Sequence, residues 1–160
     1  MFIRFITTGG TIDKVYFDAL SQFEIGDSPV NAILADGLIS FDCDVVPMFR
    51  KDSLELTDDD RRHLRDFIAG DDADLYVVSH GTDTMVDTAD VLKDLAGKTI
   101  VLTGSLSPAR FKTTDAVFNV GMAVAAVQTA SPGVYIAMSG RVFPAGNVRK
   151  NRDENRFEEA

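Results

Sequence analysis

The chain has 160 residues, of which 45% are hydrophobic and 26% are charged. This is the composition of an ordinary soluble domain, and we predict a single domain over residues 1–160. Sixteen Lys and Arg against 25 Asp and Glu give a formal charge of -9, which disfavours nucleic acid and anionic membranes as partners. The single cysteine, Cys43, excludes an internal disulfide framework. Because the sequence also lacks a signal-peptide pattern and a membrane-spanning apolar run, we expect a cytoplasmic protein.

Short apolar runs alternate with helical segments along the chain. Runs rich in β-branched and aromatic residues predict strands at residues 2–5, 44–49, 75–79, 99–103 and 134–138. Capping residues and apolar periodicity predict helices at 31–34, at 57–69 ending at Gly70, after 82–84 ending at Gly97, and at 115–129. Near-continuous apolar strands separated by helices indicate an α/β fold, a three-layer sandwich with a mostly parallel, flavodoxin/Rossmann-like sheet flanked by helices.

Three segments depart from this simple alternation. Residues 13–29 lack a clear period and carry Asp18, Ser21, Gly26 and Pro29 as breakers, so we predict a long loop of the kind that often forms a lid. Residues 105–114 are predicted to form a second polar loop. The helix at 115–129 is apolar nearly all round, which predicts burial on more than one side, either in a thick core or against a second subunit.

A glycine turn follows the first predicted strand and carries several hydroxyl groups. Gly9 and Gly10 allow a sharp turn and a close approach to a ligand, and Thr7, Thr8 and Thr11 flank them. The carboxyl end of a parallel strand is the edge at which ligands bind. Thr11 is therefore either a turn residue that supports the backbone or a nucleophile, and the residues alone leave both open. Neither a Rossmann nor a P-loop fingerprint is present.

A second cluster, residues 79–84, follows the strand at 75–79. Thr82, Asp83 and Thr84 are all good helix caps, but a cap needs only one such residue, so capping and function have equal weight. Free N–H groups at a helix start could also bind a carboxylate or an oxyanion. For His80 we favour a structural hydrogen-bonding role, because His63 is the only other histidine. No cluster has metal-ligand spacing, and we predict neither a metal nor a cofactor.

The charged segment at residues 147–152 has two interpretations. Such a run usually forms a solvated surface. The alternative is that the Lys150 amine is kept partly neutral by burial and by Arg149 and Arg152, so that it can accept a proton.

Taken together, residues 8–12 and 80–84 resemble the two signature motifs of the bacterial-type L-asparaginases. Asp52-Ser53 is similar to the substrate-contacting loop of that family, and residues 148–150 are similar to the segment with its catalytic lysine. Further matches to the family pattern are Thr103-Gly104, Asp115 and Phe118-Asn119. Typical members are about twice as long and carry a second domain, whereas this chain stops just after the lysine segment. We therefore expect the short-chain form, which consists of the N-terminal domain alone.

The resemblance implies an L-asparagine amidohydrolase in which Thr11 attacks the side-chain amide and forms an acyl-enzyme. Thr82, Asp83 and Lys150 would form a second triad, with Lys150 accepting a proton through Thr82, and Tyr16 would be the loop tyrosine beside the nucleophile. Asp83 and Ser53 would hold the substrate's α-amino and α-carboxylate groups. The full set implied to bind L-asparagine or L-aspartate is Gly10, Asp52, Ser53, Gly81, Thr82 and Asp83.

Leu54 and Asn151 depart from the family pattern, at positions where many relatives carry a polar residue and a threonine. A homodimer or higher homo-oligomer would form through apolar helices such as 115–129. The rival interpretations are a non-catalytic amino-acid-binding or regulatory module and the amidase subunit of an amidotransferase.

Overall fold

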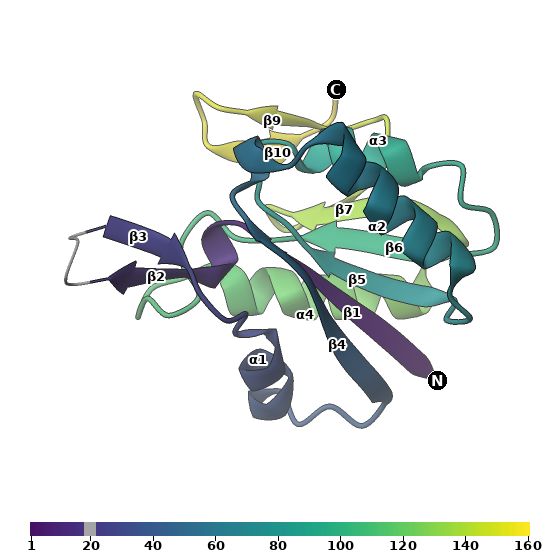
Figure 1. Cartoon of the computed structure of the whole chain (residues 1–160), viewed down its shortest axis with the longest axis horizontal. Helices are drawn as coiled ribbons and strands as arrows, with labels where there is room; N and C mark the ends of the chain where they lie inside the picture. The colour runs from purple at the N-terminus through teal and green to yellow at the C-terminus, as the bar shows by residue number, and fades with distance from the viewer. Residues whose placement is uncertain (18–21) are drawn as a thin grey trace.

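A computed structural model describes residues 1–17 and 22–160 of the chain (Figure 1). Its centre is a six-stranded sheet with the order β4-β1-β5-β6-β7-β8. These strands are β1 (Phe2–Gly9), β4 (Asp42–Lys51), β5 (Leu75–Ser79), β6 (Thr99–Thr103), β7 (Gly133–Met138) and β8 (Arg141–Pro144). All neighbouring pairs are parallel except β7 and β8, which are antiparallel. The predicted α/β fold with a mostly parallel sheet is confirmed.

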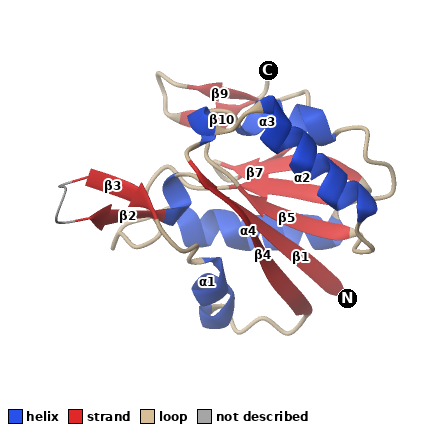
Figure 2. Cartoon of the chain, viewed as in Figure 1, coloured by secondary structure: helices blue, strands red, loops and turns tan. Residues whose placement is uncertain are grey.

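Helices cover both faces of this sheet (Figure 2). On one face, α2 (Asp58–Gly70) and α3 (Met85–Leu92) pack in a core that includes Ile6, Leu64 and Ala89. On the other face, α1 (Val30–Asp36) and α4 (Ala116–Thr129) pack in a core that includes Ile3 and Phe5. Successive side chains of a strand point to opposite faces, so β1 supplies both cores and the molecule has the three predicted layers.

Local capping chemistry explains where α2 begins. The Asp60 N–H donates to Thr57 Oγ1 at 3.2 Å, and the Thr57 N–H donates to Asp60 Oδ2 at 2.8 Å. This reciprocal pair satisfies two N–H groups that the first helical turn would leave without partners. Among the described residues, no helix is long and apolar enough to cross a membrane.

Residues 13–29 do not form the predicted long loop. The segment contains the antiparallel strands β2 (Lys14–Phe17) and β3 (Gln22–Ile25), a hairpin that projects from the sheet (Figure 1). Tyr16 lies opposite Phe23 in this hairpin. Such a cross-strand aromatic pair stabilises strand pairing without requiring apolar and polar residues to alternate along either strand. The predicted breakers Asp18 and Ser21 lie outside the described residues.

The chain also contains elements that its sequence did not predict. A short turn of 3-10 helix, Thr11–Asp13, follows β1, and another, Ser53–Glu55, follows β4. After β8 come β9 (Arg149–Asn151) and β10 (Arg156–Glu158), which pair antiparallel. The segment predicted as a helix at 31–34 and that predicted as a strand at 44–49 extend further, as α1 and β4.

The environment of α4 corrects one expectation. The helix buries Ala123 against the sheet and Ala116 and Val120 against Ile12, but Val117 and Phe118 on its outer side are 58% and 63% exposed. The thick-core alternative is therefore wrong, because the described residues of this chain leave the outer side of the helix exposed. Burial against a second subunit stays a prediction.

Candidate active site

The two predicted motifs meet at one edge of the sheet. In chain order, the five parallel strands are arranged 2-1-3-4-5, the flavodoxin-like order, in which the order reverses between the first strand and the third. Those two strands are β1 and β5. Thr11 follows the carboxyl end of β1, and Gly81 and Thr82 follow that of β5. The motifs therefore flank the crevice where open α/β sheets bind ligands.

Backbone contacts between three loops hold this edge together. Gly10 has a φ of 87°, and a Cβ added to it would lie 2.4 Å from the Cα of Gly81. A Cβ added to Gly81 would in turn lie 2.6 Å from the Cβ of Ser53. Neither contact leaves room for a side chain, which explains why glycine occupies both positions. The loops carrying Thr11, Thr82 and Ser53 are thereby brought together.

Thr11 opens the 3-10 turn at this edge and is half-buried. Hydrogen bonds hold the turn on either side of it: Asp13 N–H donates to Gly10 O at 3.1 Å, and Ala109 N–H donates to Ile12 O at 3.2 Å. Among residues 1–17 and 22–160, the Thr11 hydroxyl itself forms no hydrogen bond that would make it a support for the turn. The nucleophile role of Thr11 stays a prediction.

Lys150 lies next to the second motif. Its Nζ donates to Thr82 Oγ1 at 2.7 Å and to Asp83 Oδ1 at 2.8 Å, and its side chain is only 13% exposed. The predicted members Thr82, Asp83 and Lys150 are therefore in direct contact. A relay that passes a proton from Thr82 to Lys150 uses the same contact with the direction reversed, the Thr82 hydroxyl donating to a neutral amine.

The position of Lys150 depends on buried residues on either side of it. Val148 and Phe157 are both buried in the core beside α2 and α3, and Phe157 pairs directly with Lys150 across β9 and β10. The solvated-surface interpretation of this segment is correct for Arg149 and Arg152, which are exposed, and wrong for Lys150. The apolar residue at 157 is the signal that sequence reasoning missed.

Thr84 has a role that the sequence did not indicate. It occupies the N-cap position of α3, yet its side chain forms no capping hydrogen bond. Its hydroxyl instead donates to the Ser53 carbonyl at 2.7 Å and ties the Ser53 loop to the start of the helix. The capping explanation of this motif therefore fails for Thr84, and Ser53, which is also buried, is held from two sides.

His80 is structural, as predicted. It is fully buried, with Nδ1 2.7 Å from the Gly81 carbonyl oxygen and Nε2 2.8 Å from Thr88 Oγ1. A carbonyl oxygen can only accept, so Nδ1 carries the proton and Nε2 accepts from Thr88. Burial lowers the pKa of His80 to about 4, which keeps the ring neutral at physiological pH.

Asp52 and Tyr16 have other partners in this structure. Asp52 accepts from the Leu54 N–H at 3.2 Å and pairs with Lys14 Nζ at 3.0 Å. Burial opposes its ionisation, but these hydrogen bonds prevail and lower the pKa of Asp52. Tyr16 is 54% exposed and stacks edge-on against Phe23. Within the described part of the chain, no hydrogen bond joins Tyr16 to Thr11, and the roles of Tyr16 and Asp52 stay predictions.

The loop after β6 is fixed against the same edge. Asp115 accepts from the N–H groups of Leu106 and Ser107, and Asn119 Nδ2 donates to the Gly104 carbonyl at 3.0 Å. A Cβ on Gly104 would lie 2.3 Å from the His80 carbonyl oxygen, so this loop packs directly on the second motif. Within the described ranges, no three His, Cys, Asp or Glu side chains form a group that could hold a metal ion.

The fold and the site together define an α/β domain of flavodoxin-like strand order with a threonine, lysine and aspartate cluster at its switch point. The family model described as the N-terminal domain of asparaginase matches residues 2–157, and the chain belongs to this family.

Named relatives agree with this membership. The chain is 32% identical over 87 residues to an L-asparaginase of Thermococcus kodakarensis, an alignment that covers 52% of this chain and 26% of that protein. It is 39% identical over 83 residues to a probable periplasmic L-asparaginase of Haemophilus influenzae, covering 48% of this chain and 24% of that protein.

Solved structures show the same fold. The thermostable L-asparaginase of Thermococcus kodakarensis has a TM-score of 0.82 at 24% identity, a likeness that shows the fold alone. A probable cytoplasmic L-asparaginase of Campylobacter jejuni has a TM-score of 0.78 at 27% identity. Each match covers 99% of this chain and 51% of the other, so the chain spans about half the length of these solved relatives.

Proposed function

We propose that the chain is an L-asparagine amidohydrolase that releases aspartate and ammonia through an acyl-enzyme on Thr11. The observation that carries the proposal is the contact of Lys150 Nζ with both Thr82 Oγ1 and Asp83 Oδ1, at 2.7 and 2.8 Å. The loop that holds Thr82 is in backbone contact with the loop that holds Thr11, through Gly10 and Gly81. A site that only bound an amino acid would not need a lysine in contact with a threonine hydroxyl.

In the proposed reaction, the Thr11 oxygen attacks the side-chain amide carbon of asparagine while its proton passes to the relay of Thr82 and Lys150. The Thr82 N–H would lie near the oxyanion that forms on the carbonyl oxygen. Collapse of this intermediate breaks the carbon–nitrogen bond, and the leaving nitrogen takes a proton and departs as ammonia. Water then attacks the ester, releases aspartate and returns the proton to Thr11.

Substrate binding would use the groups around the crevice. The Asp83 carboxylate and the Ser53 loop would hold the α-amino and α-carboxylate groups, with Gly10, Asp52 and Gly81 completing the pocket. Tyr16 would approach Thr11 from the hairpin. The double tether of Ser53, through Thr84 and Gly81, supports this role because a fixed group orients an amide at less entropic cost.

The outer side of α4 supports a proposed homodimer or higher homo-oligomer. Val117 and Phe118 are exposed there, and large exposed apolar side chains on one helix face favour an interface. The cytoplasm is the proposed location, and the single cysteine of the chain supports it. The relatives' names include both a cytoplasmic and a periplasmic protein.

The test is release of ammonia from L-asparagine, L-glutamine and D-asparagine by the purified chain, beside Thr11→Ala and Lys150→Met. We expect activity on L-asparagine that both substitutions abolish, and that Lys112→Met, at an exposed position, retains. Unchanged activity in Thr11→Ala would exclude the nucleophile. Tight aspartate binding without turnover would favour a binding module, and turnover only with a synthetase partner would favour an amidotransferase subunit.

A further inference from the structure

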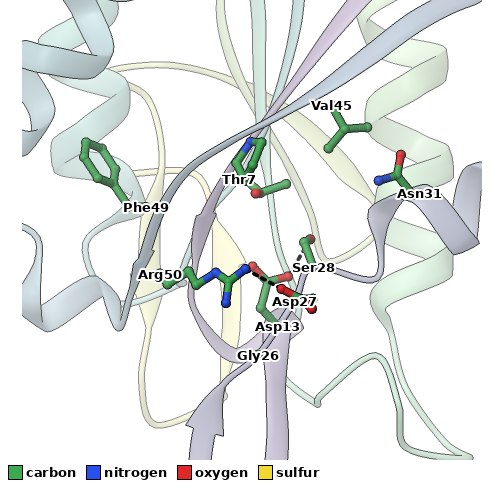
Figure 3. Close-up of a pocket in the computed structure, with 10 residues that line it drawn as sticks. Thr7, Asp13, Gly26, Asp27, Ser28, Asn31, Val45, Phe49 and Arg50 are labelled. Atoms are coloured by element: carbon green, nitrogen blue, oxygen red, sulfur yellow. Dashed lines mark hydrogen bonds and ion pairs between the residues drawn. The ribbon is translucent and has the colours of Figure 1, made fainter.

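A cavity of about 220 Å³ lies beside the candidate active site, at the base of the hairpin and the end of β4 (Figure 3). Its lining does not include Thr11, Thr82 or Lys150. It does include Asp13, the last residue of the 3-10 turn that Thr11 begins. The cavity is therefore separate from the proposed catalytic groups but shares a turn with the nucleophile.

Two polar side chains deep in this cavity are almost completely buried. Asp13 is 3% exposed and Thr7 is 2% exposed. Asp13 accepts a hydrogen bond from Ser28 Oγ at 2.7 Å, as drawn in Figure 3. Within the part of the chain that the structure describes, no lysine or arginine forms an ion pair with Asp13, and the Thr7 hydroxyl forms no hydrogen bond. A buried carboxylate without an ion pair is costly, so this end of the cavity favours a positively charged ligand.

The other residues of the cavity lining limit the size and charge of such a ligand. Val45, Pro47 and Phe49 form an apolar wall. At the exposed mouth, Arg50 forms an ion pair with Asp27. Two carboxylates and one guanidinium leave the lining with an excess of negative charge, which disfavours anions. A volume of 220 Å³ holds roughly seven water molecules at about 30 Å³ each, which is enough for a small organic molecule.

We propose that this cavity is a binding site for a small ligand with a primary ammonium group, held by the Asp13 carboxylate and the hydroxyls of Thr7 and Ser28. Three N–H donors match one carboxylate and two hydroxyl oxygens, all of which can accept. The ammonium can belong to a simple amine or to a free amino acid, whose carboxylate would then meet Arg50 at the mouth. Binding at this site does not depend on the proposed activity.

The contacts of Asp13 give such a ligand a route to the nucleophile turn. The Gly26 N–H donates to the Asp13 carbonyl at 2.9 Å and closes the base of the hairpin, while the Asp13 N–H donates to Gly10. Burial raises the pKa of Asp13 to about 6, against the opposing effects of Ser28, the Gly9 N–H and the Arg50 charge. Asp27 and Arg50 are the other charged groups of the lining. Ammonium binding should therefore strengthen as the pH rises from about 5 to 7.5, because Asp13 ionises over that range.

The test is calorimetric titration of the full chain with methylammonium, glycine and tetramethylammonium chloride. We expect methylammonium and glycine to bind and tetramethylammonium, which has no N–H donor, not to bind. Affinity should fall roughly tenfold or more in Asp13→Asn, because a charge-assisted hydrogen bond is lost. The matched control Asp36→Asn, at an exposed position on α1, should bind as the wild type does.

Further variants separate this cavity from the active site. Thr7→Val, which keeps the side-chain shape, should also weaken binding because it removes a hydroxyl acceptor, whereas Asp83→Asn should leave methylammonium binding unchanged. Glycine binding more tightly than methylammonium would identify an amino acid as the ligand class, and the reverse order a simple amine. Binding lost in Asp83→Asn but kept in Thr7→Val, or no binding of either primary ammonium, would overturn the proposal. Loss of asparagine turnover alone would affect only the proposed function.

Discussion

Replacement of Asp13 by Asn should stabilise the protein at neutral and alkaline pH. Asp13 is 3% exposed, and burial raises the pKa of its carboxyl group from 3.8 to about 6. At about 1.36 kcal/mol per pH unit, this difference corresponds to about 3 kcal/mol between the protonated and the ionised side chain. Asparagine resembles the protonated form in shape and carries no charge. One acceptor oxygen is lost with the substitution, so we expect a net gain of about 2 kcal/mol at pH 8.

The sign of the pH dependence follows from the direction of the pKa change. The folded state binds the Asp13 proton more tightly than the unfolded state, so this stabilising contribution is complete below pH 3.8 and is lost as the pH rises through about 6. The stability difference between Asp13→Asn and the wild type should therefore be largest at pH 8 and close to zero or slightly negative near pH 4.

Thermal and urea unfolding at pH 4, 6 and 8 would measure this difference. For a domain of this size, about 2 kcal/mol corresponds to a rise in Tm of roughly 4–8 °C. Asp36→Asn, on the exposed side of α1, controls for the change in net charge and should show no such rise. An Asp13→Asn protein that is less stable than the wild type at pH 8, or a difference that stays constant with pH, would refute the reasoning.

Three further predictions concern other parts of the molecule. Phe157→Ala should lower the free energy of unfolding by about 3–5 kcal/mol and should abolish ammonia release, because it empties part of the core. Arg149→Ala, which removes an exposed ion pair to Glu158, should change the free energy of unfolding by less than about 1 kcal/mol. Gly10→Ala should abolish ammonia release because its Cβ would overlap the Gly81 backbone. Gly121→Ala in α4, where a Cβ meets nothing within 4 Å, should instead raise the free energy of unfolding by about 0.5–1 kcal/mol. Phe118→Glu should reduce the molar mass measured by sedimentation to that of a monomer; an unchanged oligomer would exclude this helix as the interface.

The central sheet and the meeting of the two motifs could be predicted from the sequence because each depends on local or regular features. Buried parallel strands leave continuous apolar runs, and Thr57 with Asp60 marks the start of α2 with a short-range capping pattern. Once the strands are parallel, their carboxyl ends must share an edge, so the residues after β1 and β5 must lie on the same side of the molecule.

The hairpin, the setting of Lys150 and the cavity could not be predicted in this way because each depends on contacts between distant segments. Tyr16 and Phe23 stabilise strands that have no apolar period of their own. Lys150 is placed by Phe157, which pairs with it from the next strand and is buried against helices formed much earlier in the chain. The environment of Asp13 is created by residues of β4 and by the loop before α1, and no local pattern marks that carboxyl group as buried.

The late position of β9 has a consequence for the synthesis of the protein. A ribosome adds residues in order, so all six strands of the sheet, and Thr11, Ser53 and Thr82 with them, are made before Lys150. A nascent chain that ends after β8 therefore contains Thr11 and the other residues of the crevice but lacks the amine that contacts Thr82. Under the proposed mechanism, truncated translation products would be inert on asparagine, and hydrolysis would begin only after β9 and β10 have emerged and paired.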